Sequence, residues 1–249
     1  MTSHPYYPLN AAIPGYQANA TGLPVVLALF GGITTGVVFV AYSMASRQQP
    51  ALRSLDCFAA AWFALCAFLH ICFEGEDKHV GNMTSTGCNK LYMCKLIFLT
   101  TKKKGYFIYF KAELVSQHTL FAMLWKEYAL SDSRYLTGDL FTLCIETITV
   151  LAWGPLSLLT ALSIIFRSPS RHFLQVLICM AHLYGVILYY STNWADYRVS
   201  GISYSRPEFL YFWVYYVGFN MPWVVVPLGK TLSFSFIPSI LSLETLGAP

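Results

Sequence analysis

The chain has very few charged residues, and this scarcity excludes most classes of soluble protein. Asp, Glu, Lys and Arg make up 11% of its 249 residues, whereas hydrophobic residues make up 56%. Soluble domains carry about 25% charged residues. The mean hydropathy of +0.51 points the same way. A disordered chain, a nucleic-acid-binding protein and an ordinary cytosolic enzyme are therefore excluded, so no nucleic-acid partner is expected.

Motifs for the common reaction classes are also missing. The sequence contains no Ser-His-Asp order, HExxH, Walker loop, GxGxxG or CxxC, so hydrolase, zinc, nucleotide and redox functions lack support. Most of the cysteines lie in apolar stretches, where a free Cys behaves as a small hydrophobe. No internal repeat is present, which disfavours a transporter.

Long apolar runs are what the sequence does contain. A hydrocarbon core of about 30 Å needs about 20 apolar residues in a helix. Five runs meet this requirement, and together they predict an all-α, polytopic membrane protein built as a bundle of five transmembrane helices. They extend over approximately Leu23–Ser46, Leu55–Gly75, Gly138–Phe166, Phe173–Thr192 and Phe209–Leu228.

Arginines in the short loops predict the orientation of this bundle. Arg47 and Arg53 lie between the first two runs, and Arg167 and Arg171 lie between the third and fourth. Positively charged short loops stay in the cytosol. The N-terminus is therefore expected on the luminal side.

The predicted domain organisation follows from the runs and from one unusual segment. We expect a luminal N-terminal segment at 1–22, a membrane domain at 23–230 and a divergent C-terminal tail at 231–249. An atypical insertion at about 76–104 contains most of the lysines. Deleting it would bring Glu74-Gly75 next to Tyr106-Phe107, so the insertion is either a retained intron, which sequencing of the transcript would reveal, or a genuine loop.

Polar side chains inside apolar runs are functional-site candidates, because ionisable groups are costly within a membrane. His70 and Glu74 share one helix face through their i,i+4 spacing. His182, in the fourth run, is interpreted instead as a packed, hydrogen-bonded histidine. The candidates in the second, third and fifth runs are His70, Glu74, Glu146, Thr149, Asn220 and Trp223.

These candidates are expected to meet in one half-buried cavity. At about 1.5 Å per residue, His70, Glu146 and Asn220 fall within roughly 10 Å of one depth. Burial disfavours charge, so a carboxyl there can keep its proton near neutral pH and serve as an acid beside a base. An indole face favours a cation, and apolar walls favour a lipid-like ligand. The pattern indicates either proton transfer on a hydrophobic substrate or a receptor for amphiphilic amines.

The same residues carry a family resemblance. Around them the sequence resembles the emopamil-binding protein family, the sterol Δ8-Δ7 isomerases of the EXPERA superfamily, over about 55–230 apart from the insertion. The matching segments are Trp62 to Gly75, Leu124-Trp125-Lys126-Glu127-Tyr128, Asp132-Ser133-Arg134-Tyr135, Glu146-Thr147-Ile148-Thr149, Trp153-Gly154-Pro155, Tyr211-Phe212-Trp213, Asn220 and Trp223.

The resemblance implies an enzyme of the endoplasmic reticulum membrane that moves a sterol double bond from C8=C9 to C7=C8. It implies no cofactor and no metal. The expected partners are a sterol within the bilayer and amphiphilic amine ligands, while the oligomeric state, a homodimer included, is left open.

The resemblance also implies residue roles. His70, Glu74 and Glu146 would be the acid/base groups. Trp223 would face the carbocation, and Thr149 and Asn220 would hold Glu146 or its proton. Three further residues would complete the substrate- and cation-binding set by ordering the loop over the cavity mouth, namely Tyr128, Asp132 and Arg134.

Two alternatives stay open from the sequence. The fold is compatible with a non-catalytic receptor or lipid carrier, although binding alone would not need the whole acid/base set. The chain is also compatible with an isomerase that acts on another terpenoid.

Overall fold

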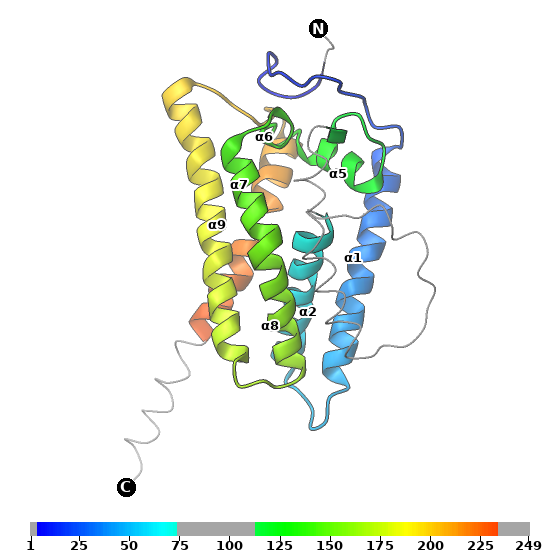
Figure 1. The fold of residues 1–249 in the computed structure, drawn as a ribbon, viewed down its shortest axis with the longest axis vertical. Helices are drawn as coiled ribbons and strands as arrows, with labels where there is room; N and C mark the ends of the chain where they lie inside the picture. The colour runs from blue at the N-terminus through cyan, green and yellow to red at the C-terminus, as the bar shows by residue number, and fades with distance from the viewer. Residues whose placement is uncertain (1–3, 74–112, 234–249) are drawn as a thin grey trace.

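The computed structural model describes residues 4–73 and 113–233, which form a bundle of long helices (Figure 1). Within these ranges the chain contains no β-strand, so the predicted all-α class is confirmed. The long elements are α1 (Leu23–Ser46), α2 (Ser54–Phe68), α7 (Leu140–Ile148), α8 (Gly154–Ile165) and α9 (Arg171–Ser200).

Among the residues that the structure describes, four helical stretches are long and apolar enough to cross a membrane, namely Leu23–Ser46, Ser54–Cys72, Leu140–Ile165 and Arg171–Ser200. They coincide with the first four predicted runs. The predicted fifth run is helical but not continuous, because a turn at 219–221 separates η4 (Leu210–Gly218) from a helix over 222–233. Pro222 begins the second piece, where its missing N–H costs nothing.

Small residues let the helices at the centre of the bundle approach closely. α2 packs against both α1 and α8, and Ala59 and Ala60 on α2 are fully buried beside Ala45 of α1 and Ala161 of α8. In lipid no hydrophobic effect drives helices together, so membrane helices associate through the close van der Waals packing that small side chains allow. α2 is therefore the central helix of the described bundle.

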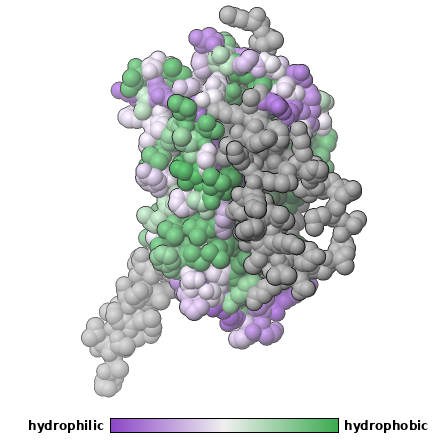
Figure 2. Space-filling view, in the orientation of Figure 1, coloured by the Kyte–Doolittle hydropathy of each residue, from purple (hydrophilic) through white to green (hydrophobic). Residues whose placement is uncertain are grey.

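The outer surface has the pattern of a membrane protein. An apolar band occupies the middle of the molecule between more polar ends (Figure 2). α1 contributes large exposed side chains, including Phe39 and Val40. Exposed apolar side chains of this kind are stable against lipid rather than water, so the chain is a membrane protein.

Within the described ranges, three stretches are π-helical rather than α-helical. They are η1 (Leu69–Phe73) at the end of α2, η3 (Thr149–Trp153) between α7 and α8, and η4. A π-turn inserts one residue and re-aims the side chains around it, often at functional sites. All three stretches contribute residues to the same cavity.

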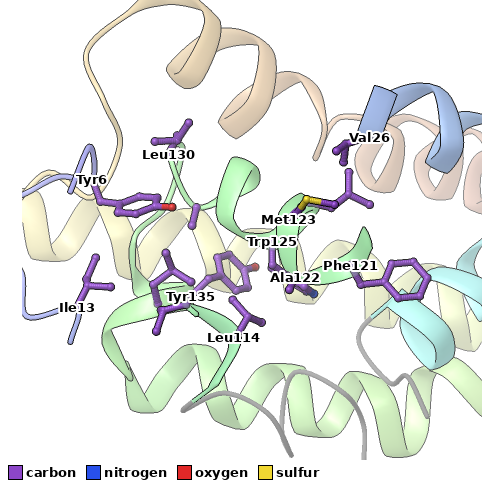
Figure 3. Close-up of a cluster of buried hydrophobic side chains, with 14 of the residues drawn as sticks. Tyr6, Ile13, Val26, Leu114, Phe121, Ala122, Met123, Trp125, Leu130 and Tyr135 are labelled. Carbon is purple, nitrogen blue, oxygen red and sulfur yellow. The ribbon is translucent and has the colours of Figure 1, made fainter. Parts of the chain in front are cut away.

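One end of the bundle is closed by a cap, which we define as residues 4–22 and 113–139. It includes the short helices α5 (Leu120–Tyr128) and α6 (Arg134–Thr137). The N-terminal segment lies over these helices, and Tyr6 and Ile13 pack into one buried cluster with Trp125 and Tyr135 (Figure 3).

Hydrogen bonds fix the N-terminal segment in the cap. Tyr6 Oη donates to the carbonyl of Lys126 at 3.1 Å, and Lys126 Nζ donates to the carbonyls of Gln17 at 2.9 Å and Gln117 at 2.8 Å. Burial lowers the pKa of the Lys126 ammonium, and its two carbonyl partners satisfy two of its three N–H groups. The cap therefore joins distant parts of the sequence.

The predicted insertion at about 76–104 and the candidate Glu74 lie outside the described residues. Most of the predicted C-terminal tail, from residue 234 onward, also lies outside them.

Candidate active site

A cavity of about 500 Å³ lies inside the bundle next to the cap, and its walls are mostly apolar. This volume is within the range of small-molecule sites. η1, α7, η3, α9, η4 and the cap helix α5 all contribute to the lining. The sequence-predicted residues on its wall are His70, Glu146, Thr149, Asn220, Trp223 and Tyr128.

The pole of the cavity farther from the cap is formed by two histidines and a tryptophan, and we call it the inner pole. His70 Nε2 and His182 Nε2 lie 3.3 Å apart, and both side chains are buried. The Trp223 ring lies 6.4 Å from the His70 ring and 5.6 Å from the Trp62 ring, centroid to centroid. Imidazole and indole faces thus share this end of the cavity.

The pole nearer the cap, the outer pole, carries the described carboxyl. Tyr135 Oη donates to Glu146 Oε1 at 3.2 Å, and Glu146 is only 8% exposed. Asn220 Nδ2 donates to Tyr128 Oη at 3.2 Å and to the carbonyl of Tyr216 at 2.8 Å. Glu146 therefore places a buried carboxyl, hydrogen-bonded to a tyrosine of the cap, on the wall of the cavity.

Two helices give the same separation between the poles. Glu146 precedes Gly154 by eight positions, and Gly154 packs against His70. Because part of this stretch is the more compressed π-helix η3, the rise puts Glu146 about 10 Å from the level of His70. On α9, His182 and Tyr189 are seven positions apart, or about 10 Å, and Tyr189 lies beside Tyr135. The cavity is therefore elongated along the bundle axis, with polar groups at both poles.

Gly154 allows the close approach of the π-helical stretches η1 and η3. A Cβ added at Gly154 would lie 2.7 Å from Ile71 Cγ1 and 3.2 Å from His70 Cβ. Only glycine fits there, so this contact fixes the height at which His70 enters the cavity.

We expect Gly154→Ala to lower the free energy of unfolding by about 1–3 kcal/mol, the usual cost of overpacking. Thermal unfolding of the purified protein in detergent measures the change. Ile71→Ala in the same chain should recover part of the loss, because it removes the clashing atom. Gly36→Ala on α1 is the control, since a Cβ there meets nothing within 4 Å. Equal stability of Gly154→Ala and the control would contradict the packing argument.

Asp132 and Arg134 are behind the cavity wall rather than on it. Arg134 Nη2 lies 2.7 Å from Asp132 Oδ2, its Nη1 donates to Thr192 Oγ1 at 3.1 Å, and both charged residues are almost fully buried. The guanidinium carbon lies 5.1 Å from the centroid of the Tyr189 ring, which does line the cavity. The guanidinium therefore lies against a ring of the cavity wall, and the ordering of the loop over the cavity mouth by Asp132 and Arg134 stays a prediction.

Thr149 and Asn220 were predicted to hold Glu146. Thr149 Oγ1 donates to the carbonyl of Ile145 at 2.8 Å, one helical turn back, and Asn220 bonds to Tyr128 and Tyr216 as described above. Their contact with Glu146 stays a prediction. Glu74 lies outside the described residues.

Sequence reasoning missed three cavity residues. His182 was predicted to be packed and hydrogen-bonded, which is confirmed, but its place on the cavity wall was missed. It lies on one helix face with Gly185, Val186 and Tyr189, and this spacing was a readable signal. Tyr135, the donor to Glu146, gave no such signal, because it reaches the cavity through the folding of the cap.

Glu127 is the third missed residue. It lines the cavity and accepts a hydrogen bond of 3.2 Å from Tyr215 Oη. Burial raises the pKa of its carboxyl, and the hydrogen bond from Tyr215 and the charge of Arg206 oppose that rise. The cavity therefore has a second described carboxyl, supplied by the cap.

Comparison with known proteins gives consistent matches. Residues 120–233 match the family model described as EXPERA (EXPanded EBP superfamily). A 3-beta-hydroxysteroid-Delta(8),Delta(7)-isomerase from Cavia porcellus is 28% identical over 225 residues, which covers 90% of this chain and 84% of that protein. A protoglabretal synthase from Citrus sinensis is 34% identical over 194 residues, or 77% of this chain and 74% of that protein. An isomeliandiol synthase from Ailanthus altissima is 32% identical over 181 residues, or 70% of this chain and 81% of that protein.

Proposed function

The chain belongs to the EXPERA (EXPanded EBP superfamily) family, and from this premise we propose that it is a 3β-hydroxysteroid Δ8-Δ7 isomerase. One observation carries the proposal, namely an apolar cavity whose few polar groups include a buried carboxyl and two imidazoles. Such a cavity accepts a sterol and can exchange protons with it. The proposed double-bond shift consists of proton transfers alone.

The proposed reaction adds one proton and removes another. An acid delivers a proton to C9, the C8=C9 electron pair forms the new C9–H bond, and C8 becomes a carbocation. A base then takes a proton from C7, and that C–H electron pair becomes the C7=C8 bond. His70, Glu74 and Glu146 are the proposed acid/base groups, and the net proton count does not change.

The environment of the cavity supports a carbocation intermediate. The cap and the apolar walls exclude water, which would otherwise capture the cation. The negative face of an indole ring attracts a cation, so Trp223 is proposed to face C8. Thr149 and Asn220 are proposed to orient the carboxyl, while Tyr128 closes the cavity from the cap.

The proposal extends to the location and partners of the protein. The substrate would enter from the bilayer of the endoplasmic reticulum, with the cap on the luminal side. Amphiphilic amines would bind the cavity as mimics of the carbocation. We also propose a homodimer as the assembly to test.

A second candidate function has its own support. The protoglabretal synthase of Citrus sinensis and the isomeliandiol synthase of Ailanthus altissima are 34% and 32% identical over 77% and 70% of this chain, against 28% over 90% for the Cavia porcellus isomerase. An isomerase that acts on another terpenoid would use the same proton transfers. A non-catalytic receptor on this fold is less well supported, because binding alone does not need both a buried carboxyl and buried imidazoles in the cavity.

Complementation tests the proposal directly. The chain is expressed in cells that lack sterol Δ8-Δ7 isomerase, and their sterols are measured by mass spectrometry. We expect Δ8-sterols to disappear and Δ7-sterols to form. If Δ8-sterol persists although the protein is abundant in the membrane, the chain is not this isomerase, and turnover of another terpenoid becomes the next assay.

We expect Trp223→Ala to weaken the binding of a cationic amphiphilic amine by about 1–2 kcal/mol, the value of a desolvated cation–π contact. Competition for a radiolabelled amine in membranes measures the change. Trp213→Ala is the matched control, because Trp213 is exposed on η4. Equal affinities of the two variants would leave Trp223 with a packing role only.

A further inference from the structure

His182 is the direct side-chain partner of His70 at the inner pole. The two Nε2 atoms lie 3.3 Å apart, and the ring centroids lie 5.5 Å apart with the planes inclined by 55°. His70 is 7% exposed and His182 is 6% exposed. Both side chains line the cavity, His182 from α9 and His70 from η1.

A hydrogen bond between these two nitrogens requires one proton between them. A neutral imidazole has one N–H donor and one bare nitrogen acceptor. Two N–H groups facing each other would repel, and two bare nitrogens would make no bond. Burial among apolar side chains disfavours a charged imidazolium. One histidine therefore donates from Nε2, and the other accepts at Nε2.

The second nitrogen of His182 decides the direction. Within the described part of the chain, His182 Nδ1 is buried without a hydrogen-bond partner. A proton on Nδ1 would create a buried N–H without an acceptor, and such orphan donors are rare among buried side chains. A neutral histidine side chain in water also favours the proton on Nε2. His182 therefore carries its proton on Nε2 and donates it to His70.

We infer that His182 is a positioning residue that holds His70 in the tautomer with its proton on Nδ1, an inference that rests on the proposed function. In this state His70 presents a fixed N–H donor and stays neutral, because a second proton at its Nε2 would meet the N–H of His182. The proton that reaches the sterol then comes from a carboxyl. Within the proposed acid/base set, His182 thus limits His70 to the role of a neutral hydrogen-bond donor.

Variants at His182 separate positioning from packing. His182→Leu fills similar space without a donor, and we expect kcat to fall about 10-fold, as for other partners that orient a histidine, with KM changed less than about 2-fold. His182→Gln keeps an amide N–H that can reach His70 Nε2, and it should recover most of the loss. His172→Leu is the matched control, since it makes the same change at an exposed position on α9.

The tautomer itself can be observed without any turnover. ¹⁵N NMR of the protein with labelled histidines should show His70 with a protonated Nδ1 and a bare Nε2, and His182 with the reverse. The His70→Asn and His182→Gln variants assign the signals. A protonated Nε2 on His70, or an unchanged kcat in His182→Leu, overturns the inference. If the wild-type protein does not isomerise Δ8-sterols, the proposed function fails, while the NMR pattern still decides the tautomer.

Discussion

Replacing Glu146 by glutamine is expected to lower the turnover of a Δ8-sterol by about 100-fold or more. Glutamine keeps the shape of the side chain and can still accept the hydrogen bond from Tyr135 Oη, which lies 3.2 Å from Glu146 Oε1. It has no titratable proton, however, so it can neither deliver a proton to the sterol nor take one back. General acid–base catalysis contributes about 10²–10⁴-fold to rates. Conversion of Δ8-sterol by purified protein in lipid nanodiscs measures the effect.

Two further variants make this test specific. Glu113→Gln introduces the same change at an exposed position of the cap and should leave turnover unaffected. Tyr135→Phe keeps the carboxyl and removes only its hydrogen-bond donor, so a smaller loss is expected. Near-normal turnover in Glu146→Gln would remove this carboxyl from the proposed mechanism.

Replacing Arg134 by leucine is expected to lower the free energy of unfolding by about 3–5 kcal/mol. Arg134 and Asp132 are paired through two N–H groups on one edge of the guanidinium, with Nη2–Oδ2 at 2.7 Å and Nε–Oδ1 at 3.0 Å, and both are shielded from solvent. Without the arginine, the carboxylate stays buried with no positive partner. Breaking a buried ion pair from one side costs this much, because the remaining charge is uncompensated.

The control for Arg134→Leu removes both charges. An Asp132→Leu and Arg134→Leu double variant has no isolated carboxylate, so it should be more stable than the single variant. Arg134→Lys should fall between the wild type and Arg134→Leu, because lysine keeps the charge but lacks the planar fork. Unfolding in mixed detergent micelles, followed by tryptophan fluorescence, measures all four proteins. A single variant as stable as the double variant would show that the pair does not stabilise the cap.

The helices and their membrane character could be predicted from the sequence because both depend on local composition. Four apolar runs correspond to continuous helices, three of them of nearly the predicted extent, while the fourth continues beyond the predicted Thr192 to Ser200. The fifth run was predicted as one helix, but the chain turns at 219–221 and places Asn220 and Pro222 against the cavity. A hydropathy profile averages over such a turn and cannot detect it.

The partners within the cavity could be predicted only in part. His70, Glu146, Asn220 and Trp223 were identified because polar groups are costly in an apolar run, and all four line the cavity. The bonding between residues was not accessible in this way, since His70 and His182 are 112 positions apart in the sequence. Their contact depends on how α9 packs beside η1.

The sequence by itself determined the class of the protein, the membrane environment and the chemical groups that are available for proton transfer, because hydrophobicity and side-chain chemistry are properties of the residues themselves. Only the tertiary structure decided that a carboxyl and a histidine pair lie at opposite poles of one cavity, that the Asp132–Arg134 pair is behind its wall, and that Glu127 and Tyr135 reach it from the cap. These outcomes depend on π-turns, on the close packing at Gly154 and on contacts between distant segments. Such features follow from the mutual fit of helices, which no local pattern encodes.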